Sequence, residues 1–167
     1  MDHAERVPGT VMMLRISGAG VVTALMAGVT LSISNQRQVL AQSAVDTTIT
    51  IRASGSTLEF TPMRVSARAG TRLRIRFIND GTLPHNLVVP KSDDDIDTLA
   101  LSAYQAAETG YVPMDLTSKL LGWTTLASPG QSVETTFVVP AAGEYTYICL
   151  FPGHSNSMLG TLRALKP

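Results

Sequence analysis

Three side chains that bind soft metal ions lie close together near the C-terminal end of the chain. Cys149, His154 and Met158 follow one another in the pattern Cys-x4-His-x3-Met. A second histidine, His85, stands much earlier, in the sequence LPHN. Thiolate and thioether ligands stabilise Cu(I), and imidazole binds both oxidation states of copper. The four residue types therefore fit one rigid site that exchanges a single electron with little rearrangement of its ligands.

The cysteine and histidine counts exclude most other metal and redox sites. Cys149 is the single cysteine, so the chain has no intrachain disulfide, no Cys-x-x-Cys pair and no iron–sulfur cluster. There are three histidines, and His3 lies in the N-terminal extension, which excludes the multi-histidine clusters of multicopper oxidases. Zinc prefers a tetrahedral set without a thioether, and a dinuclear copper centre needs a second bridging cysteine. The sequence predicts one copper ion per chain, as Cu(I) or Cu(II).

Length and charge indicate a single neutral domain. The chain has 167 residues, and its thirteen Lys and Arg balance thirteen Asp and Glu. With 16% charged residues and a mean hydropathy of +0.16, it is too apolar for a disordered chain and too neutral for a nucleic-acid binder. We expect one hydrophobic core, a monomer, and no nucleic-acid partner.

The N-terminal segment has the features of an export signal. Residues 16–33 carry no charge, follow Arg15, and precede the small-residue sequence Val39-Leu40-Ala41, which suits signal peptidase. The apolar run is also just long enough for a membrane span. Residues 1–41 are therefore predicted to be a signal peptide or a membrane anchor, and residues 42–167 the folded domain. Either alternative places that domain outside the cytoplasm, in the periplasm or attached to the membrane.

The domain itself is predicted to be all-β. Alternation is strictest in residues 71–78, where Leu73, Ile75 and Phe77 are expected to face inward and three arginines outward. Asn79-Asp80-Gly81 is expected to end that strand with a turn. The predicted strands are residues 47–52, 63–66, 71–78, 85–89, 133–139, 143–150 and 160–165.

Such a series of short strands favours an antiparallel β-sandwich. Between the strands, residues 93–109 begin with four aspartates, which suits the N-terminus of a helix. Residues 106–122 are expected to form an irregular flap. The arginines of residues 71–78 are expected mainly to solvate an exposed strand, although they could also steer an acidic partner.

The ligand loop resembles that of a known family. The sequences YTYICLFPGHSNSMLGTL and PHNLVVP resemble the cupredoxins, and AAGEYTYICLFPGH is most similar to the auracyanins. The spacing Cys-x4-His-x3-Met is similar to that of azurins and auracyanins, whereas plastocyanins have a shorter loop. The resemblance implies a cupredoxin-like Greek-key sandwich with a short helical flap and a type 1 (blue) copper site.

The resemblance also implies a role for each ligand. It makes His85, Cys149 and His154 equatorial copper ligands and Met158 an axial one. Pro84 stands where azurin has a glycine whose carbonyl approaches the metal, so no fifth ligand is assigned.

Residues around the ligands take their roles from the same resemblance. Asn86 is expected to join the two ligand loops, and the backbone N–H groups of Asn86 and Phe151 to donate to the Cys149 sulfur. Pro152 has no N–H and cannot donate there. Tyr145 is expected to be a structural tyrosine corner.

These features predict an electron carrier without enzymatic activity. An enzyme of the nitrite reductase or oxidase type would require further histidine ligands, which the chain lacks. Its partners would be redox proteins, both donors and acceptors. They would dock on an apolar rim around the exposed edge of His154, formed by Leu83, Pro84 and Pro152 together with Phe151. The alternative is a copper-binding or copper-trafficking protein outside the cytoplasm, although few methionines lie in the body of the chain.

Overall fold

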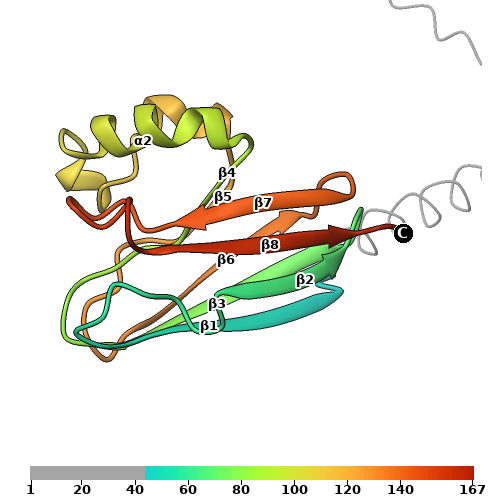
Figure 1. Cartoon of the computed structure of the whole chain (residues 1–167), viewed down its shortest axis with the longest axis horizontal. Coiled ribbons are helices and arrows are strands. Elements are labelled where there is room, and N and C mark those ends of the chain that lie inside the picture. Colours follow the sequence, from blue (N-terminus) through green and yellow to red (C-terminus); the bar gives the residue numbers. More distant parts are fainter. Residues whose placement is uncertain (1–43) are drawn as a thin grey trace, which may run out of the picture. The chain divides into compact units, whose positions relative to one another are not determined.

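The computed structural model describes residues 44–167, which form a β-sandwich with a helical flap (Figure 1). The expected leader, residues 1–41, lies outside the described residues. One sheet has the strand order β1-β3-β6 and the other β2-β8-β7-β4-β5. The strands are β1 (Thr47–Gly55), β2 (Arg64–Arg68), β3 (Arg72–Gly81), β4 (Val88–Pro90), β5 (Leu120–Trp123), β6 (Ser132–Val138), β7 (Gly143–Ile148) and β8 (Leu159–Leu165).

The expected sandwich is confirmed, but its strand pairing is mixed, not wholly antiparallel. β1 pairs with β3 and β2 pairs with β8 in parallel, whereas the other pairs are antiparallel. The chain crosses from β1 to β2 in the other sheet and then returns to β3. Two crossings bring β3 back in the direction of β1, which is the long connection that a parallel pair requires.

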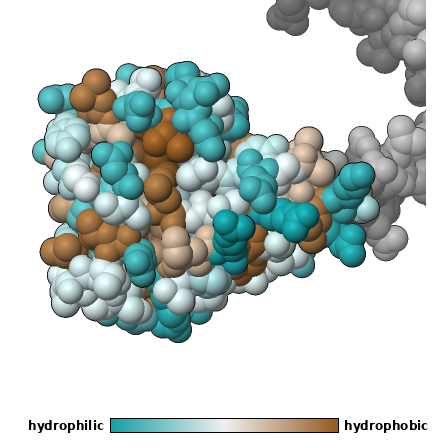
Figure 2. Space-filling model, viewed as in Figure 1, coloured by the Kyte–Doolittle hydropathy of each residue, from teal (hydrophilic) through white to brown (hydrophobic). Residues whose placement is uncertain are grey.

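The core lies between the two sheets. Leu73, Ile75 and Phe77 of β3 are fully buried, as the alternation predicts, and their arginine neighbours face outward. Tyr147 of β7 is also fully buried and packs edge-on against the ring of Phe60, with ring centroids 5.2 Å apart. In Figure 2 apolar side chains gather toward the end that carries the flap and the β7–β8 loop, and hydrophilic ones are frequent at the opposite end.

Two boundaries near the first histidine differ from expectation. β3 does not turn at residues 79–81 but continues to Gly81, because Asn79 lies in register with the inward-facing residues and is fully buried. The strand expected at residues 85–89 is shorter, since β4 begins at Val88 and His85 forms only an isolated bridge with Ala127.

The flap contains the helical segments and one strand that the sequence did not predict. Its segments are η1 (Asp93–Asp95), α2 (Ile96–Ala103), η2 (Ala107–Thr109) and η3 (Met114–Lys119). Ser92 accepts a hydrogen bond from the N–H of Asp94, so the helical region does begin at the aspartates. β5 follows directly and pairs with β4, so the irregular region ends before residue 122. None of the helices in residues 44–167 is long and apolar enough to cross a membrane.

Two smaller expectations concern side chains on the strands. The hydroxyl of Tyr145 donates to the carbonyl of Ala141 at 3.0 Å, which is the tyrosine-corner contact expected of a structural residue. Arg74 forms an ion pair with Glu134 on the neighbouring strand β6. Arg76 donates to the hydroxyl of Ser132 at 3.1 Å. These contacts lie on the outer face of the sheet, as expected for arginines that keep an exposed strand polar.

Candidate metal centre

Two segments far apart in the sequence bring the candidate ligands to one end of the sandwich. His85 lies between β3 and β4, held by its backbone bridge to Ala127. Cys149 follows the last residue of β7, and His154 and Met158 lie in the loop that leads into β8. Val88 of β4 pairs with Ile148, which sets the end of β7 beside the histidine loop.

The nitrogen and sulfur atoms of three of these residues converge. The Sγ atom of Cys149 lies 3.8 Å from Nδ1 of His85 and 3.7 Å from Nδ1 of His154, and the two nitrogens are 3.2 Å apart. The exposed fractions of the three residues are 0% for Cys149, 1% for His85 and 6% for His154. The three side chains form a closed group of potential metal ligands.

The size of this triangle fits a metal ion at its centre. Bonds of about 2.1 Å to nitrogen and about 2.3 Å to sulfur, as at zinc, require about 3.6 Å between two nitrogens in a trigonal plane. They require about 3.8 Å between a nitrogen and the sulfur. Both nitrogen–sulfur distances match this value, and the nitrogen–nitrogen distance is somewhat shorter. Two imidazoles and one thiolate in a plane are the donor set of a blue copper site.

The backbone of Met158 is hydrogen-bonded to that of Cys149 and His154. The residue is fully buried, and the loop winds back so that its N–H donates to the carbonyl of His154 at 2.8 Å. Its own carbonyl accepts from the N–H of Cys149 at 3.1 Å. These bonds fix the backbone of the candidate thioether beside both Cys149 and His154.

Burial keeps the three converging side chains uncharged when no metal is bound. It raises the pKa of the Cys149 thiol to about 11, even though the backbone N–H groups of Asn86 and Phe151 donate to the sulfur and oppose the change. Burial, and secondarily the neighbouring His154, lowers the pKa of His85 to about 4, and burial also lowers the pKa of His154. The thiol is therefore protonated and both imidazoles are neutral near pH 7.

Asn86 joins three parts of the structure around the site. Its Oδ1 accepts from the N–H of Leu150 at 2.7 Å, which links the His85 segment to the Cys149 segment. Its Nδ2 donates to the carbonyl of Gly110 in the flap at 2.8 Å. Because Asn86 is fully buried, these bonds satisfy an amide that would otherwise cost free energy.

The four residues expected to form an apolar rim near His154 are all partly exposed. Leu83 is 41% exposed, and Pro84, Phe151 and Pro152 are half-buried. The rings of Phe151 and His154 have centroids 4.8 Å apart.

Three residues near the site were not found from the sequence. Tyr111 of the flap packs edge-on against Phe151 at 5.0 Å and has a positive φ of 66°, a conformation uncommon for a tyrosine. Thr124 is fully buried and its hydroxyl accepts from the N–H of Leu87 at 3.0 Å. Asn79 is the third, and it had a detectable signal, because it is a polar residue at an inward position of an alternating strand.

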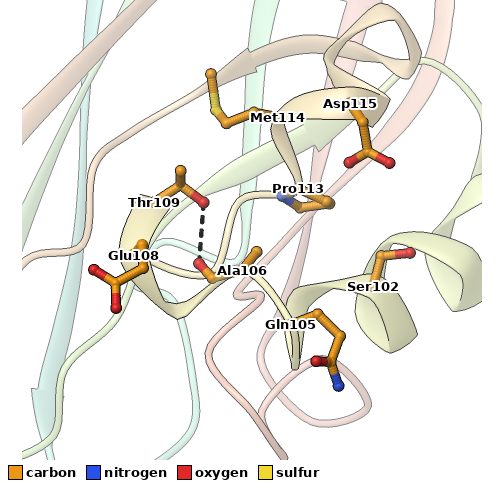
Figure 3. A pocket seen from close by; sticks show the side chains of 8 residues that line it. All are labelled: Ser102, Gln105, Ala106, Glu108, Thr109, Pro113, Met114 and Asp115. Atoms are coloured by element: carbon orange, nitrogen blue, oxygen red, sulfur yellow. Dashed lines mark hydrogen bonds between the residues drawn. The ribbon is translucent and has the colours of Figure 1, made fainter.

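A hollow in the flap is separate from this site. It has a volume of about 380 Å³ and lies between α2, η2 and η3. Figure 3 shows Glu108 and Asp115 on different sides of it, with the hydroxyl of Thr109 bonded to the carbonyl of Ala106. None of its lining residues belongs to the group of His85, Cys149 and His154.

Comparison with known proteins agrees with this arrangement of residues. Residues 47–164 match the model of the family described as copper binding proteins, plastocyanin/azurin family. Auracyanin-B of Chloroflexus aurantiacus is 38% identical over 119 residues, which are 69% of this chain and 51% of the relative. The chain thus spans about half of the length of that relative. Auracyanin-A of the same organism is 38% identical over 120 residues, 69% of this chain and 72% of the relative.

The solved structures give the same result. The structure of auracyanin A, titled a "blue" copper protein, aligns with a TM-score of 0.67 and 34% identity. The alignment covers 71% of this chain and 98% of that one. Together with the family match over most of its length, these likenesses show that this chain belongs to the plastocyanin/azurin family of copper-binding proteins.

Proposed function

We propose that this protein is a single-electron carrier that works outside the cytoplasm. In this proposal His85, Cys149 and His154 would hold one copper ion, and Met158 would be a fourth, weak ligand. Copper bound there would supply a one-electron Cu(I)/Cu(II) couple.

The observation that carries the proposal is the closed triangle of two Nδ1 atoms and one Sγ atom, with sides of 3.2 to 3.8 Å. Its three residues are at most 6% exposed, and each is held by the strands and loops described above. Such a site keeps its ligands in place and keeps water out. A trafficking protein must release its metal to a partner, for which a closed and buried site is poorly suited.

The residues around the triangle stabilise the charge and the positions of the proposed ligands, as electron exchange requires. The N–H groups of Asn86 and Phe151 stabilise negative charge on the Cys149 sulfur. Asn86 ties the two ligand segments together, which limits their movement when the charge of the site changes.

Electrons are proposed to enter and leave through His154, the most exposed of the three residues in the triangle. The rim of Leu83, Pro84, Phe151 and Pro152 lets the docking face of a redox protein approach that edge and dry it at low cost. Donor and acceptor would both be redox proteins, and the carrier itself would act as a monomer.

The leader supports a location outside the cytoplasm. Residues 1–41 are proposed to direct export, either as a cleaved signal peptide or as a retained membrane anchor. N-terminal sequencing of protein isolated from its native host distinguishes the two. A mature start at Gln42 means a released carrier, and an intact segment 16–33 means a tethered one.

Copper titration followed by visible spectroscopy tests the proposed site. The oxidised protein is expected to bind one copper and to show an intense sulfur-to-copper charge-transfer band at about 600 nm. The Cys149→Ala variant, as the matched control, is expected to stay folded and to lack the band. Copper-loaded wild-type protein that stays colourless under oxidant would contradict the proposal.

A further inference from the structure

Asn79 is a buried amide in a strand whose other inward positions are apolar. It continues the series Leu73, Ile75 and Phe77 on the inner face of β3, and its exposed fraction is 0%. An amide buried among apolar side chains costs free energy unless each of its polar groups is hydrogen-bonded. A polar residue at such a position is therefore explained by the groups that it binds.

Each polar atom of the Asn79 side chain has a hydrogen-bond partner. Its Nδ2 donates to the carbonyls of Leu83 and Ala127, both at 2.8 Å. Its Oδ1 accepts from the N–H of Gly81 at 3.0 Å. The orientation of the amide is unambiguous, because a flipped group would place its oxygen against two carbonyl oxygens.

These bonds reach His85 from both sides. Leu83 precedes His85 by two residues, and Pro84 between them has a restricted φ. Ala127 is the backbone partner of His85: the N–H of His85 donates to its carbonyl at 3.1 Å, and its N–H donates to the carbonyl of His85 at 2.8 Å. The Ala127 carbonyl thus accepts from both Asn79 and His85. The approach to His85 and the backbone opposite it are fixed by one side chain.

Two asparagines therefore hold His85 in different ways. Asn86, the next residue, links His85 to the Cys149 segment through the N–H of Leu150. Asn79 links the same histidine to β3 and to the segment that contains Ala127. A ligand is held within a few tenths of an ångström only when the groups around it are themselves fixed by packing and hydrogen bonds.

We infer that Asn79 is a positioning residue for the copper ligand His85. The inference rests on the proposed function: Asn79 holds Nδ1 of His85 at its distances of 3.8 Å from the Cys149 sulfur and 3.2 Å from Nδ1 of His154. Without the two N–H donors of Asn79, the His85 loop opens more easily and the triangle loses its fixed shape. Asn79 itself binds no metal.

The first test uses the full-length chain without copper. Asn79→Ser shortens the side chain and removes at least one donor, and Asn156→Ser makes the same change at an exposed position of the Cys149–Met158 loop. In Asn79→Ser, amide hydrogen exchange at His85 and Ala127 is expected to accelerate roughly tenfold or more relative to strand amides such as Tyr147. Asn156→Ser is expected to leave all of these rates unchanged. Equal acceleration throughout the sandwich, or none at His85 and Ala127, would overturn the inference.

The second test uses copper-loaded protein. Asn79→Ser is expected to lower the affinity for Cu(II) by roughly 10–100-fold and to shift the sulfur-to-copper band, whereas Asn156→Ser has the wild-type affinity and band. An unshifted band and unchanged affinity in a folded Asn79→Ser variant would contradict a positioning role. Wild-type protein that takes up no copper would overturn the proposed function, but the exchange experiment, made without copper, would still decide the role of Asn79 in holding His85.

A further measurement covers the case in which Asn79→Ser does not fold. The two side-chain N–H protons of Asn79 in the wild-type protein are expected to be protected from solvent exchange and to show couplings to the carbonyls of Leu83 and Ala127. Rapid exchange of these protons would overturn the inference. Asn79→Asp, which keeps the size of the side chain and the acceptor for Gly81, is expected to reproduce the effects of Asn79→Ser if the missing donors cause them.

Discussion

At the scale of single residues, burial of the Cys149 thiol governs the proton balance of copper uptake. The pKa of that thiol is raised to about 11, so it is protonated near pH 7, and a copper thiolate forms only when this proton leaves. The pKa of His85 is lowered to about 4, so this imidazole is already neutral at the same pH and has no proton to release. The Cys149 thiol must therefore lose a proton before it binds copper, whereas the His85 imidazole need not.

Copper binding is therefore expected to release about one proton per chain between about pH 6 and 9. Because the free thiol carries the proton throughout this range, the apparent affinity falls roughly tenfold for each unit by which the pH decreases. Below about pH 4, protonation of His85 makes the decrease steeper. Calorimetric titration in buffers of different ionisation enthalpy measures the proton count. Copper binding with no proton release at pH 7 would show that the thiol is ionised before binding or is no ligand.

Met158 is expected to adjust the reduction potential, not to hold the metal. A weak axial thioether contributes little to binding, but it disfavours Cu(II) relative to a harder oxygen ligand. Met158→Gln is predicted to keep its copper and to lower the potential by about 59 mV or more, a tenfold change in the preference for Cu(II). Protein-film voltammetry measures this shift. Loss of copper, or a potential that does not move, would show that Met158 is not the axial ligand.

At the scale of strands, β7 and β8 pack closely because Gly160 of β8 has no side chain. Tyr147 of β7 pairs with Gly160 of β8, and a Cβ atom on Gly160 would lie 2.2 Å from the tyrosine ring. The ring has no free space to move into, because it is fully buried and its hydroxyl donates to the carbonyl of Pro62 at 2.8 Å. The glycine is needed for space at this position, which lies two residues beyond Met158.

Gly160→Ala is therefore expected to reduce the free energy of unfolding by about 1–3 kcal/mol. Gly143→Ala on β7 is the matched control, because a Cβ atom there meets its nearest neighbour at an ordinary 3.7 Å. That variant is expected to change stability by less than about 1 kcal/mol. Urea denaturation of the metal-free proteins measures both values. Equal stability of the two variants would mean that Tyr147 relaxes without cost.

The loops that form the rim should control exchange with partners. Leu83→Glu places a charge beside the edge of His154, where a partner must remove water, and is predicted to slow electron self-exchange roughly tenfold. The absorption spectrum and the potential should change little. Arg74→Ser, on the outer face of β3, is the contrasting variant, since its side chain pairs with Glu134 away from the rim. If the self-exchange rate is unchanged in Leu83→Glu but decreases sharply in Arg74→Ser, docking occurs on the arginine face of β3 and not at the rim.

At the scale of the whole molecule, local sequence patterns predicted the features of single strands and loops correctly, but they did not predict how distant strands pair. Alternation in β3 correctly predicted the inward side chains, because it follows from the geometry of a single strand. The close spacing of Cys149, His154 and Met158 predicted a common loop for the same local reason. Asn79-Asp80-Gly81 has the composition of a turn, yet burial of Asn79 keeps it within β3.

What the sequence did not predict depends on contacts between distant segments. The parallel pairs of β1 with β3 and β2 with β8 follow from crossings between sheets, which strand patterns do not encode. β5 was missed because its four residues gain their strand geometry only by pairing with β4. The partners of Asn79 and the contact of Tyr111 with Phe151 likewise join residues that the sequence separates.

The central claim is that one buried copper, held by His85, Cys149 and His154, exchanges one electron reversibly. Spectroelectrochemical titration of the copper-loaded full-length protein tests it most directly. The absorption band at about 600 nm is predicted to disappear on reduction and to return fully on oxidation, along a Nernst curve for one electron per copper. A band that does not return, a copper that leaves on reduction, or a curve for another number of electrons would contradict it.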